Sequence, residues 1–196
     1  MRLIVITPET PVTAEAEAIM TMLDRGVERV HLRHPRLSAD DVATIIEKID
    51  AQYHGRLSLN DFHELASRYG CGIHLNGRNP LAPEGFDGIV SRSCHSITEA
   101  EAAAPVTDYR FISPVFDSIS KQGYTAAFTP GELRRAFDDG LLDGDTFALG
   151  GVSADTMALL RDTGFSGAAV LGAAWGNGSH EDISQRINRL LQCCNS

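Results

Sequence analysis

His95 is the side chain of this sequence best suited to acid–base chemistry. It follows residues 88–91, whose composition predicts a strand. An unperturbed imidazole titrates near about pH 6.5, so it can both accept and donate a proton. The competing interpretation is a structural histidine at a strand end.

A lysine and several hydroxyls lie together in a long stretch, roughly residues 113–128, that is predicted to be a loop. Lys121 lies close in sequence to Ser113, Ser118 and Ser120. A cation placed there could contact an oxygen of a phosphate or a diphosphate. The alternative is an exposed lysine among serines that contact only water. Arg33, directly after a predicted strand, has the same two interpretations.

Two glycine-marked segments near the end of the sequence could hold an anion. Residues 147–152 and 167–172 each read as a short apolar strand that stops at glycine, at Gly150–Gly151 and at Gly172. Backbone N–H groups left bare at such turns can bind phosphate without a basic side chain.

The elements that must position these residues alternate between strand and helix along the chain. Apolar runs predict the strands, and apolar residues at helical spacing predict the helices. The predicted strands are residues 2–7, 27–32, 56–59, 72–75, 88–91, 108–112, 147–152 and 167–172. The predicted helices include residues 12–25, one capped by Ser38, residues 62–69, one capped by Ser96, one beginning near Pro130, and residues 183–193.

Alternation of this kind predicts a parallel sheet, and eight units that end in a pair of glycine turns favour a closed (β/α)8 TIM barrel. We expect a single domain over residues 1–196. The alternative is a doubly wound open sheet. It would need a glycine fingerprint after the first strand, where the sequence has Thr7-Pro8-Glu9-Thr10.

In a barrel the catalytic side chains lie at the carboxyl ends of the strands. This rule adds polar residues that follow or end the second to fifth predicted strands. They are His31, His34, Asn60, Asp61, His74, Asn76, Arg78, Asn79, Ser91 and Ser93. The competing interpretation of Asn60-Asp61 is an ordinary turn or helix cap.

Composition limits the partners of this chain. Its 196 residues carry a net charge of −9, which argues against nucleic acid or an anionic membrane as the main partner. No apolar run is long enough to span a bilayer, and the first apolar stretch is too short for a signal peptide. The four cysteines form no CxxC pair, which fits reduced thiols in a cytoplasmic protein. Exposed barrel helices could pair two copies into a homodimer.

Seven short segments of this chain, in the same order, match motifs of one known family. They are Val30–Arg33, Leu59–Asp61, Gly72–Leu75, Ser91–Ser96, Asp108–Lys121, Gly150–Val152 and Gly167–Gly172. Each segment is a weak signal alone. Together they resemble the thiamine phosphate synthase superfamily, which includes the TenI-type thiazole tautomerases, over nearly the whole chain.

This resemblance implies a barrel that binds a thiazole phosphate as its small-molecule substrate at the last two loops. It implies catalytic roles for His95 and Lys121. The substrate-binding residues that it implies are His31, Arg33, Asn60, Ser93, Ser118, Ser120, Gly150, Gly151, Leu171 and Gly172.

The superfamily contains two chemistries, and the synthase is the more demanding. It joins a pyrimidine diphosphate to the thiazole phosphate, and it needs Mg²⁺ to neutralise the departing diphosphate. The resemblance makes Asp61 a metal ligand if the chain is a synthase, but the second metal-binding aspartate of the family falls on Asn79. A basic residue of the family falls on Pro35. The neutral Asn79 weakens the Mg²⁺ site, because Mg²⁺ prefers anionic oxygen. Pro35 in place of a basic residue leaves the diphosphate less neutralised.

The tautomerase moves a proton on a thiazole ring carboxylate and needs no metal or other cofactor. His95 matches its histidine and His31 also resembles this branch, whereas Asn60-Asp61 resembles the synthase. We therefore expect a TenI-like thiazole tautomerase, with thiamine phosphate synthase as the alternative. A third hypothesis is a phosphate-ligand-binding homologue without turnover.

Overall fold

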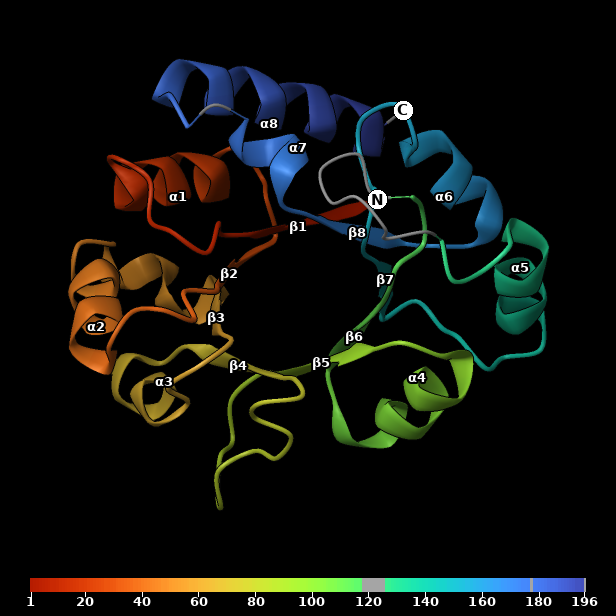
Figure 1. Ribbon diagram of the computed structural model, residues 1–196, viewed down its shortest axis with the longest axis horizontal. Helices are drawn as coiled ribbons and strands as arrows, with labels where there is room; N and C mark the ends of the chain where they lie inside the picture. The colour runs from red at the N-terminus through yellow and green to blue at the C-terminus, as the bar shows by residue number, and fades with distance from the viewer. Residues whose placement is uncertain (118–125, 177, 196) are drawn as a thin grey trace.

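The predicted strands pair side by side into one closed ring, which Figure 1 shows at the centre of the molecule. The structure is a computed structural model that describes residues 1–117, 126–176 and 178–195. The strands are β1 (Arg2–Ile6), β2 (Arg29–Leu32), β3 (Leu57–Leu59), β4 (Gly72–Leu75), β5 (Val90–Cys94), β6 (Tyr109–Ile112), β7 (Thr146–Ala148) and β8 (Gly167–Val170). Each pairs in parallel with the next, and β8 pairs with β1 to close the barrel.

Helices surround the ring on its outer side (Figure 1). They are α1 (Glu15–Asp24), α2 (Ala39–Glu47), α3 (Glu64–Tyr69), α4 (Ile97–Ala103), α5 (Pro130–Asp138), α6 (Met157–Thr163), α7 (Gly172–Trp175) and α8 (His180–Asn195), with the 3-10 helices η1 (Ala51–Arg56) and η2 (Ala104–Val106). The predicted (β/α)8 TIM barrel is therefore confirmed. Among the described residues, no helix is both long and apolar enough to cross a membrane.

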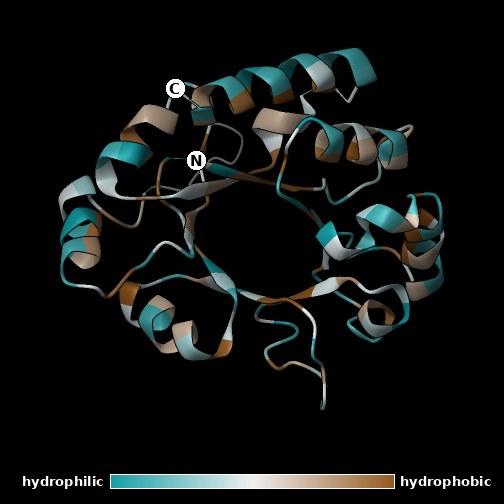
Figure 2. Ribbon diagram, turned by 180° about the vertical axis from the view of Figure 1, so that it is seen from behind, coloured by the Kyte–Doolittle hydropathy of each residue, from teal (hydrophilic) through white to brown (hydrophobic). Residues whose placement is uncertain are grey.

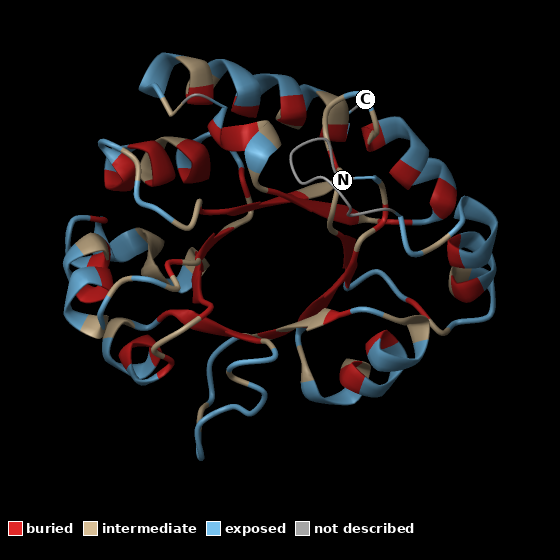
Figure 3. Ribbon diagram, in the orientation of Figure 1, coloured by how far each residue is buried: buried red, intermediate tan, exposed pale blue. Residues whose placement is uncertain are grey.

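The buried residues follow the alternation of the strands, and Figure 3 shows the strand ring buried almost throughout. Leu3 and Val5 of β1 point outward into a large apolar layer between strands and helices. Ile4 and Ile6 point inward into a smaller cluster. That inner cluster is completed by Tyr109, Phe111, Phe147 and Ala169, so one side of the barrel interior is apolar.

The helices begin where their capping residues predict. Ser38 and Asp41 form a capping box at α2, and Thr129 and Glu132 form one at α5. Ser96 accepts a hydrogen bond from the first turn of α4, which confirms the predicted cap. Figure 2 shows that the outer surfaces of the helices are largely hydrophilic.

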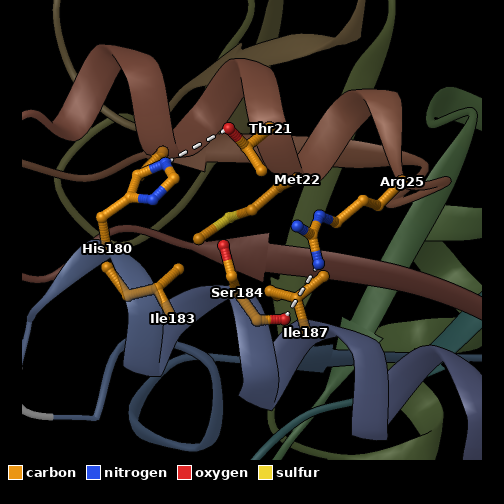
Figure 4. A pocket seen from close by; sticks show the side chains of 8 residues that line it. Thr21, Met22, Arg25, His180, Ile183, Ser184 and Ile187 are labelled. Atoms are coloured by element: carbon orange, nitrogen blue, oxygen red, sulfur yellow. Dashed lines mark hydrogen bonds between the residues drawn. The ribbon is translucent and has the colours of Figure 1, made fainter.

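The last helix packs on the first, so that the ends of the chain complete the helical layer. Figure 4 shows Met22 of α1 facing Ile183 and Ile187 of α8, flanked by polar contacts at either end. Arg25 donates to the backbone oxygen of Ser184 at 3.2 Å. This narrow crevice is part of the helix packing.

Three local features differ from the sequence-based expectation. The fifth strand is residues 90–94 and not 88–91, because Ser91 and Ser93 face a polar interior that hydropathy does not predict. The seventh strand ends at Ala148, because Gly150 and Gly151 have positive φ. The short helix α7 directly after β8 was not predicted.

Candidate active site

His95 lies at the mouth of the barrel, directly after β5, and is exposed. Its Nδ1 lies 3.2 Å from the backbone oxygen of Ser113, the first residue after β6. Because a carbonyl oxygen only accepts, Nδ1 carries the hydrogen and Nε2 is the basic nitrogen. Nε2 has no hydrogen-bond partner among the described residues. The ring is therefore oriented with its basic nitrogen available to a ligand, as a general acid–base requires.

A row of hydrogen bonds connects β4 and β5 inside the barrel. Ser91 donates to the carbonyl of Ile73 at 3.1 Å and lies 2.8 Å from Nδ1 of His74. Ser93 Oγ lies 2.8 Å from Nε2 of the same ring. Since the Ser91 hydrogen is used on the carbonyl, His74 donates from Nδ1 and accepts the Ser93 hydrogen at Nε2. Ser93 is thus left to accept a hydrogen bond from a ligand at the mouth.

His31 lies inside the barrel and is fully buried. Its Nδ1 lies 3.2 Å from Oδ1 of Asn60, and its Nε2 lies 2.6 Å from the hydroxyl of Tyr109. Its ring packs against that of His74 with centroids 4.9 Å apart. Both ring nitrogens of His31 therefore form hydrogen bonds within the protein. The bond from Nδ1 orients the side chain of Asn60 beneath the mouth.

The environment keeps the two inner histidines uncharged. Burial lowers the pKa of His74 to about 3, and it lowers the pKa of His31 well below its ordinary value, with the neighbouring His74 adding to the effect. A neutral ring has one N–H and one bare nitrogen, which agrees with the assigned hydrogen bonds. Burial also raises the pKa of the Cys94 thiol to about 11, so this cysteine is a poor nucleophile.

Asp61 lies directly after Asn60, and its carboxylate is already engaged. Arg78, in the loop after β4, places Nε 3.0 Å and Nη2 2.9 Å from the two carboxylate oxygens. Asn79 donates from Nδ2 to the same carboxylate at 3.1 Å. The carboxylate therefore accepts three N–H groups, two of them from a cation in bidentate geometry.

These residues do not fit a bound Mg²⁺ ion. Mg²⁺ takes an octahedral set of oxygen ligands, commonly with one or two carboxylates. Here the one carboxylate is neutralised by Arg78, and the position of the second carries the neutral amide of Asn79, which turns its N–H₂ toward Asp61. Within the described parts of the chain, no group of three or more histidine, cysteine, aspartate or glutamate side chains could hold a metal ion.

Arg33 and Lys121 are the other predicted cations of the mouth. Arg33, after β2, forms an ion pair with Glu9, with Nη1 2.9 Å from Oε1. Its backbone N–H donates to Thr7 at 2.8 Å, which fixes it to the end of β1. Lys121, Ser118 and Ser120 lie outside the described residues.

The glycine turn after β7 is joined to the segment after β6. The N–H groups of Val115 and Phe116 donate to the carbonyls of Leu149 and Gly150 at 3.0 Å each. Gly150 and Gly151 have φ of 93° and 66°, a region that favours glycine. These glycines therefore hold the two loops in close contact at the mouth.

The turn after β8 leads directly into α7. Leu171 precedes this helix, and its carbonyl accepts from Ala174 at 3.0 Å. Trp175 at the end of α7 donates from Nε1 to the carbonyl of Ile6 at 2.8 Å, which fixes the helix over the end of β1. The backbone N–H groups of Gly172 and Ala173 have no acceptor among the described residues, as expected for the first turn of a helix. Gly172 is exposed and Ala173 is half-buried. The two glycine turns follow neighbouring strands, so both lie at the same end of the barrel.

Sequence reasoning missed the roles of three residues that organise this site. The sequence places Tyr109 in a predicted strand and in a family segment without assigning it a contact, and Trp175 lies between the last predicted strand and the last predicted helix. Arg78 was a rim candidate without a role. Its signal was available, because a basic residue directly precedes Asn79, the position at which the family resemblance expected a carboxylate.

A closed parallel barrel whose strand ends gather a histidine, hydroxyls, amides and glycine turns is the architecture of (β/α)8-barrel enzymes. Among these, the chain belongs to the thiamine monophosphate synthase family, whose model matches residues 3–174. It is therefore an enzyme of thiamine biosynthesis, and the family resemblance predicted from its motifs is confirmed.

Individual relatives agree with this membership. The chain is similar to the thiamine-phosphate synthase of Serratia proteamaculans, with 33% identity over 175 residues that cover 83% of this chain and 81% of the relative. The corresponding values for Cronobacter sakazakii are 29% over 191 residues, 92% and 90%. A solved thiamine phosphate pyrophosphorylase from Bacteroides thetaiotaomicron superimposes with a TM-score of 0.89 at 31% identity, covering 100% of this chain and 98% of the other. These names fit the synthase, kept above as the alternative, better than the tautomerase, which is not confirmed.

Proposed function

We propose that this chain catalyses the thiamine phosphate synthase reaction. In it a hydroxymethylpyrimidine diphosphate is joined to a thiazole phosphate, and the diphosphate leaves with the electron pair of the broken C–O bond. The observation that carries this proposal is similarity over nearly the full length to proteins that bear this name. We place the reaction in the cytoplasm, which agrees with four free cysteines.

The residues of the mouth have separate tasks in this proposal. The phosphate of the thiazole lies at the turns that contain Gly151 and Gly172, where backbone N–H groups bind it. Ser93 accepts a hydrogen bond from a donor of the substrate, because its own hydrogen is held by His74. Because the residues around Asp61 do not fit a protein-held Mg²⁺ ion, we assign part of the neutralisation of the departing diphosphate to basic side chains of the mouth.

Thiazole tautomerase is the second candidate, and two observations favour it. The ring of His95 is oriented by Ser113 so that Nε2 is free to take and return a proton. Asp61 is engaged by Arg78 and Asn79, which tautomerisation would tolerate because it releases no diphosphate. The tautomerase and the synthase would bind thiazole phosphate at the same site, and the two proposals differ only in the reaction catalysed there.

One experiment separates these activities. The purified protein is incubated with hydroxymethylpyrimidine diphosphate and thiazole phosphate, and separately with the thiazole phosphate carboxylate tautomer, each with Mg²⁺ and with EDTA. Formation of thiamine phosphate with equimolar diphosphate is expected. Conversion of the tautomer without formation of thiamine phosphate would show that the enzyme is a thiazole tautomerase and not a synthase. Saturable binding of thiazole phosphate with neither product would identify a homologue without turnover.

A further inference from the structure

The pairing of Arg78 with Asp61 is the feature of the mouth that neither activity explains. The side chain of Asp61 is only 14% exposed, whereas that of Arg78 is 52% exposed. Two guanidinium nitrogens face the carboxylate, and the third, Nη1, has no hydrogen-bond partner among the described residues. One edge of the guanidinium is therefore held by the protein while the other can meet a ligand.

The loop after β4 holds Arg78 in this position. The side-chain oxygen of Asn76 accepts the backbone N–H groups of Arg78 at 2.9 Å and of Asn79 at 3.1 Å. The side-chain amides of Asn76 and Asn79 both donate to the carbonyl of Asn60, at 2.7 and 3.1 Å. The loop is thus fixed to the end of β3, immediately beside Asp61.

We propose that Arg78 takes the place of a protein-held divalent cation at Asp61 and binds the diphosphate group of the substrate. This inference rests on the proposed function for the identity of the anion. Asp61 would position the guanidinium instead of ligating a metal. The planar guanidinium offers paired N–H donors that match phosphate oxygens, which a lysine ammonium would not reproduce.

The surroundings of Arg78 make it the group on which anion binding at this side depends. A groove of about 580 Å³ opens beside it. Arg78 is the one arginine or lysine among the groove's described lining residues, which include the carboxylates of Asp61 and Glu64. His63 also lines the groove, but burial lowers its pKa, which favours the uncharged ring. Pro35 lines the same groove at the position where the family resemblance expected a basic residue. A diphosphate here therefore gains its positive contact from Arg78.

The first test measures metal binding directly, without turnover. Mn²⁺ binding is followed by electron paramagnetic resonance for the natural protein, for Asp61→Asn and for the double variant Arg78→Met with Asn79→Asp. We expect no saturable binding at millimolar Mn²⁺ for the natural protein, and a site in the double variant, whose two carboxylates are free. A site in the natural protein that disappears in Asp61→Asn would overturn the proposal.

The second test measures inorganic diphosphate binding by calorimetry in EDTA. Arg78→Met is expected to weaken it by about tenfold or more, because a charge-assisted pair of hydrogen bonds is lost. The control Arg68→Met removes an equal charge from α3, where Arg68 forms an exposed ion pair with Glu47 of α2, and it should leave the affinity unchanged. Equal affinity in Arg78→Met and the natural protein would refute the role of Arg78. Neither measurement depends on which reaction the enzyme catalyses, so failure of the proposed function remains distinguishable.

Discussion

The histidines at the strand ends differ in how their ring nitrogens are used. In His31 and His74 both ring nitrogens form hydrogen bonds to neighbouring side chains inside the barrel. In His95, Nδ1 donates to the carbonyl of Ser113, and Nε2 has no hydrogen-bond partner among the described residues. Of these three histidines, His95 is the one that combines a fixed ring with an exposed basic atom that a substrate can reach. The inner pair instead sets the orientation of Ser93 and Asn60.

Replacing His95 tests whether this free nitrogen moves a proton. His95→Ala is expected to lower thiazole tautomerisation by about 10²–10⁴-fold, the usual contribution of a positioned general acid–base. Thiazole phosphate binding should change only a few-fold, because the phosphate lies at the glycine turns. Rates come from a coupled assay and affinities from calorimetry. Undiminished tautomerisation in the variant would show that another group moves the proton.

Residue types and barrel topology together place His95, Asp61 and the glycine turns at one mouth, because all strand ends of one sense meet there. Their roles in catalysis and binding stay predictions. Residue types and topology could not reveal that Asp61 is paired with Arg78. That pairing depends on the shape of the loop after β4, which Asn76 fixes by accepting two backbone N–H groups. Loop geometry of this kind has no hydropathy period, so sequence patterns do not predict it.

Hydrophobic periodicity predicted most of the strands and helices. Apolar strands such as β1 and β4 were predicted within a residue or two, because their alternation or buried runs are clear. The polar strand β5 was shifted, since Ser91 and Ser93 are buried against His74 and not against apolar groups. The helix α7 was missed because four residues are too few to show a helical period.

The two glycine turns require glycine for different reasons, and substitution separates them. A Cβ on Gly151 would lie 2.5 Å from the backbone oxygen of Asp117 and 2.7 Å from Cβ of Phe116, and its φ is +66°. Gly151→Ala is therefore expected to lower the free energy of unfolding by at least about 1–2 kcal/mol, the cost of a left-handed residue alone. Urea denaturation measures this loss.

Gly172 is the matched position, because no described atom lies within 4 Å of a Cβ built there. Gly172→Ala should keep the stability of the fold, since alanine is the better helix former. It should weaken thiazole phosphate binding by about tenfold, or about 1.4 kcal/mol, because the methyl group occupies the space in front of the N–H groups of α7. Calorimetry measures the affinity. Unchanged binding in a folded Gly172→Ala protein would contradict the phosphate site.

The barrel interior is divided into an apolar half and a polar half. The strands β1, β6, β7 and β8 fill one half with apolar side chains. The strands β2 to β5 contribute His31, Ser58, His74 and Ser91, all buried. A polar half-core is stable only if its groups are hydrogen-bonded, and each of these four has a partner inside the barrel. Stability of the whole fold is thereby tied to the charge state of two histidines.

This arrangement predicts that the protein loses stability in mild acid. Burial depresses the pKa of His74 to about 3 and that of His31 in the same direction, whereas both titrate near about 6.5 in the unfolded chain. Below that value the unfolded chain binds more protons, so the free energy of unfolding falls as pH falls.

The expected loss is up to about 1.4 kcal/mol per pH unit for each histidine. Urea denaturation gives the free energy of unfolding at pH 7.5 and at pH 5.0, and the quantity compared between variants is the difference between these two free energies. His74→Gln should reduce that difference, because glutamine does not titrate and its amide can still bond to the serines. His180→Gln, at an exposed position in α8, should leave the difference unchanged. If His74→Gln showed the same loss between the two pH values as the natural protein, the acid sensitivity would have to arise outside the polar half of the barrel.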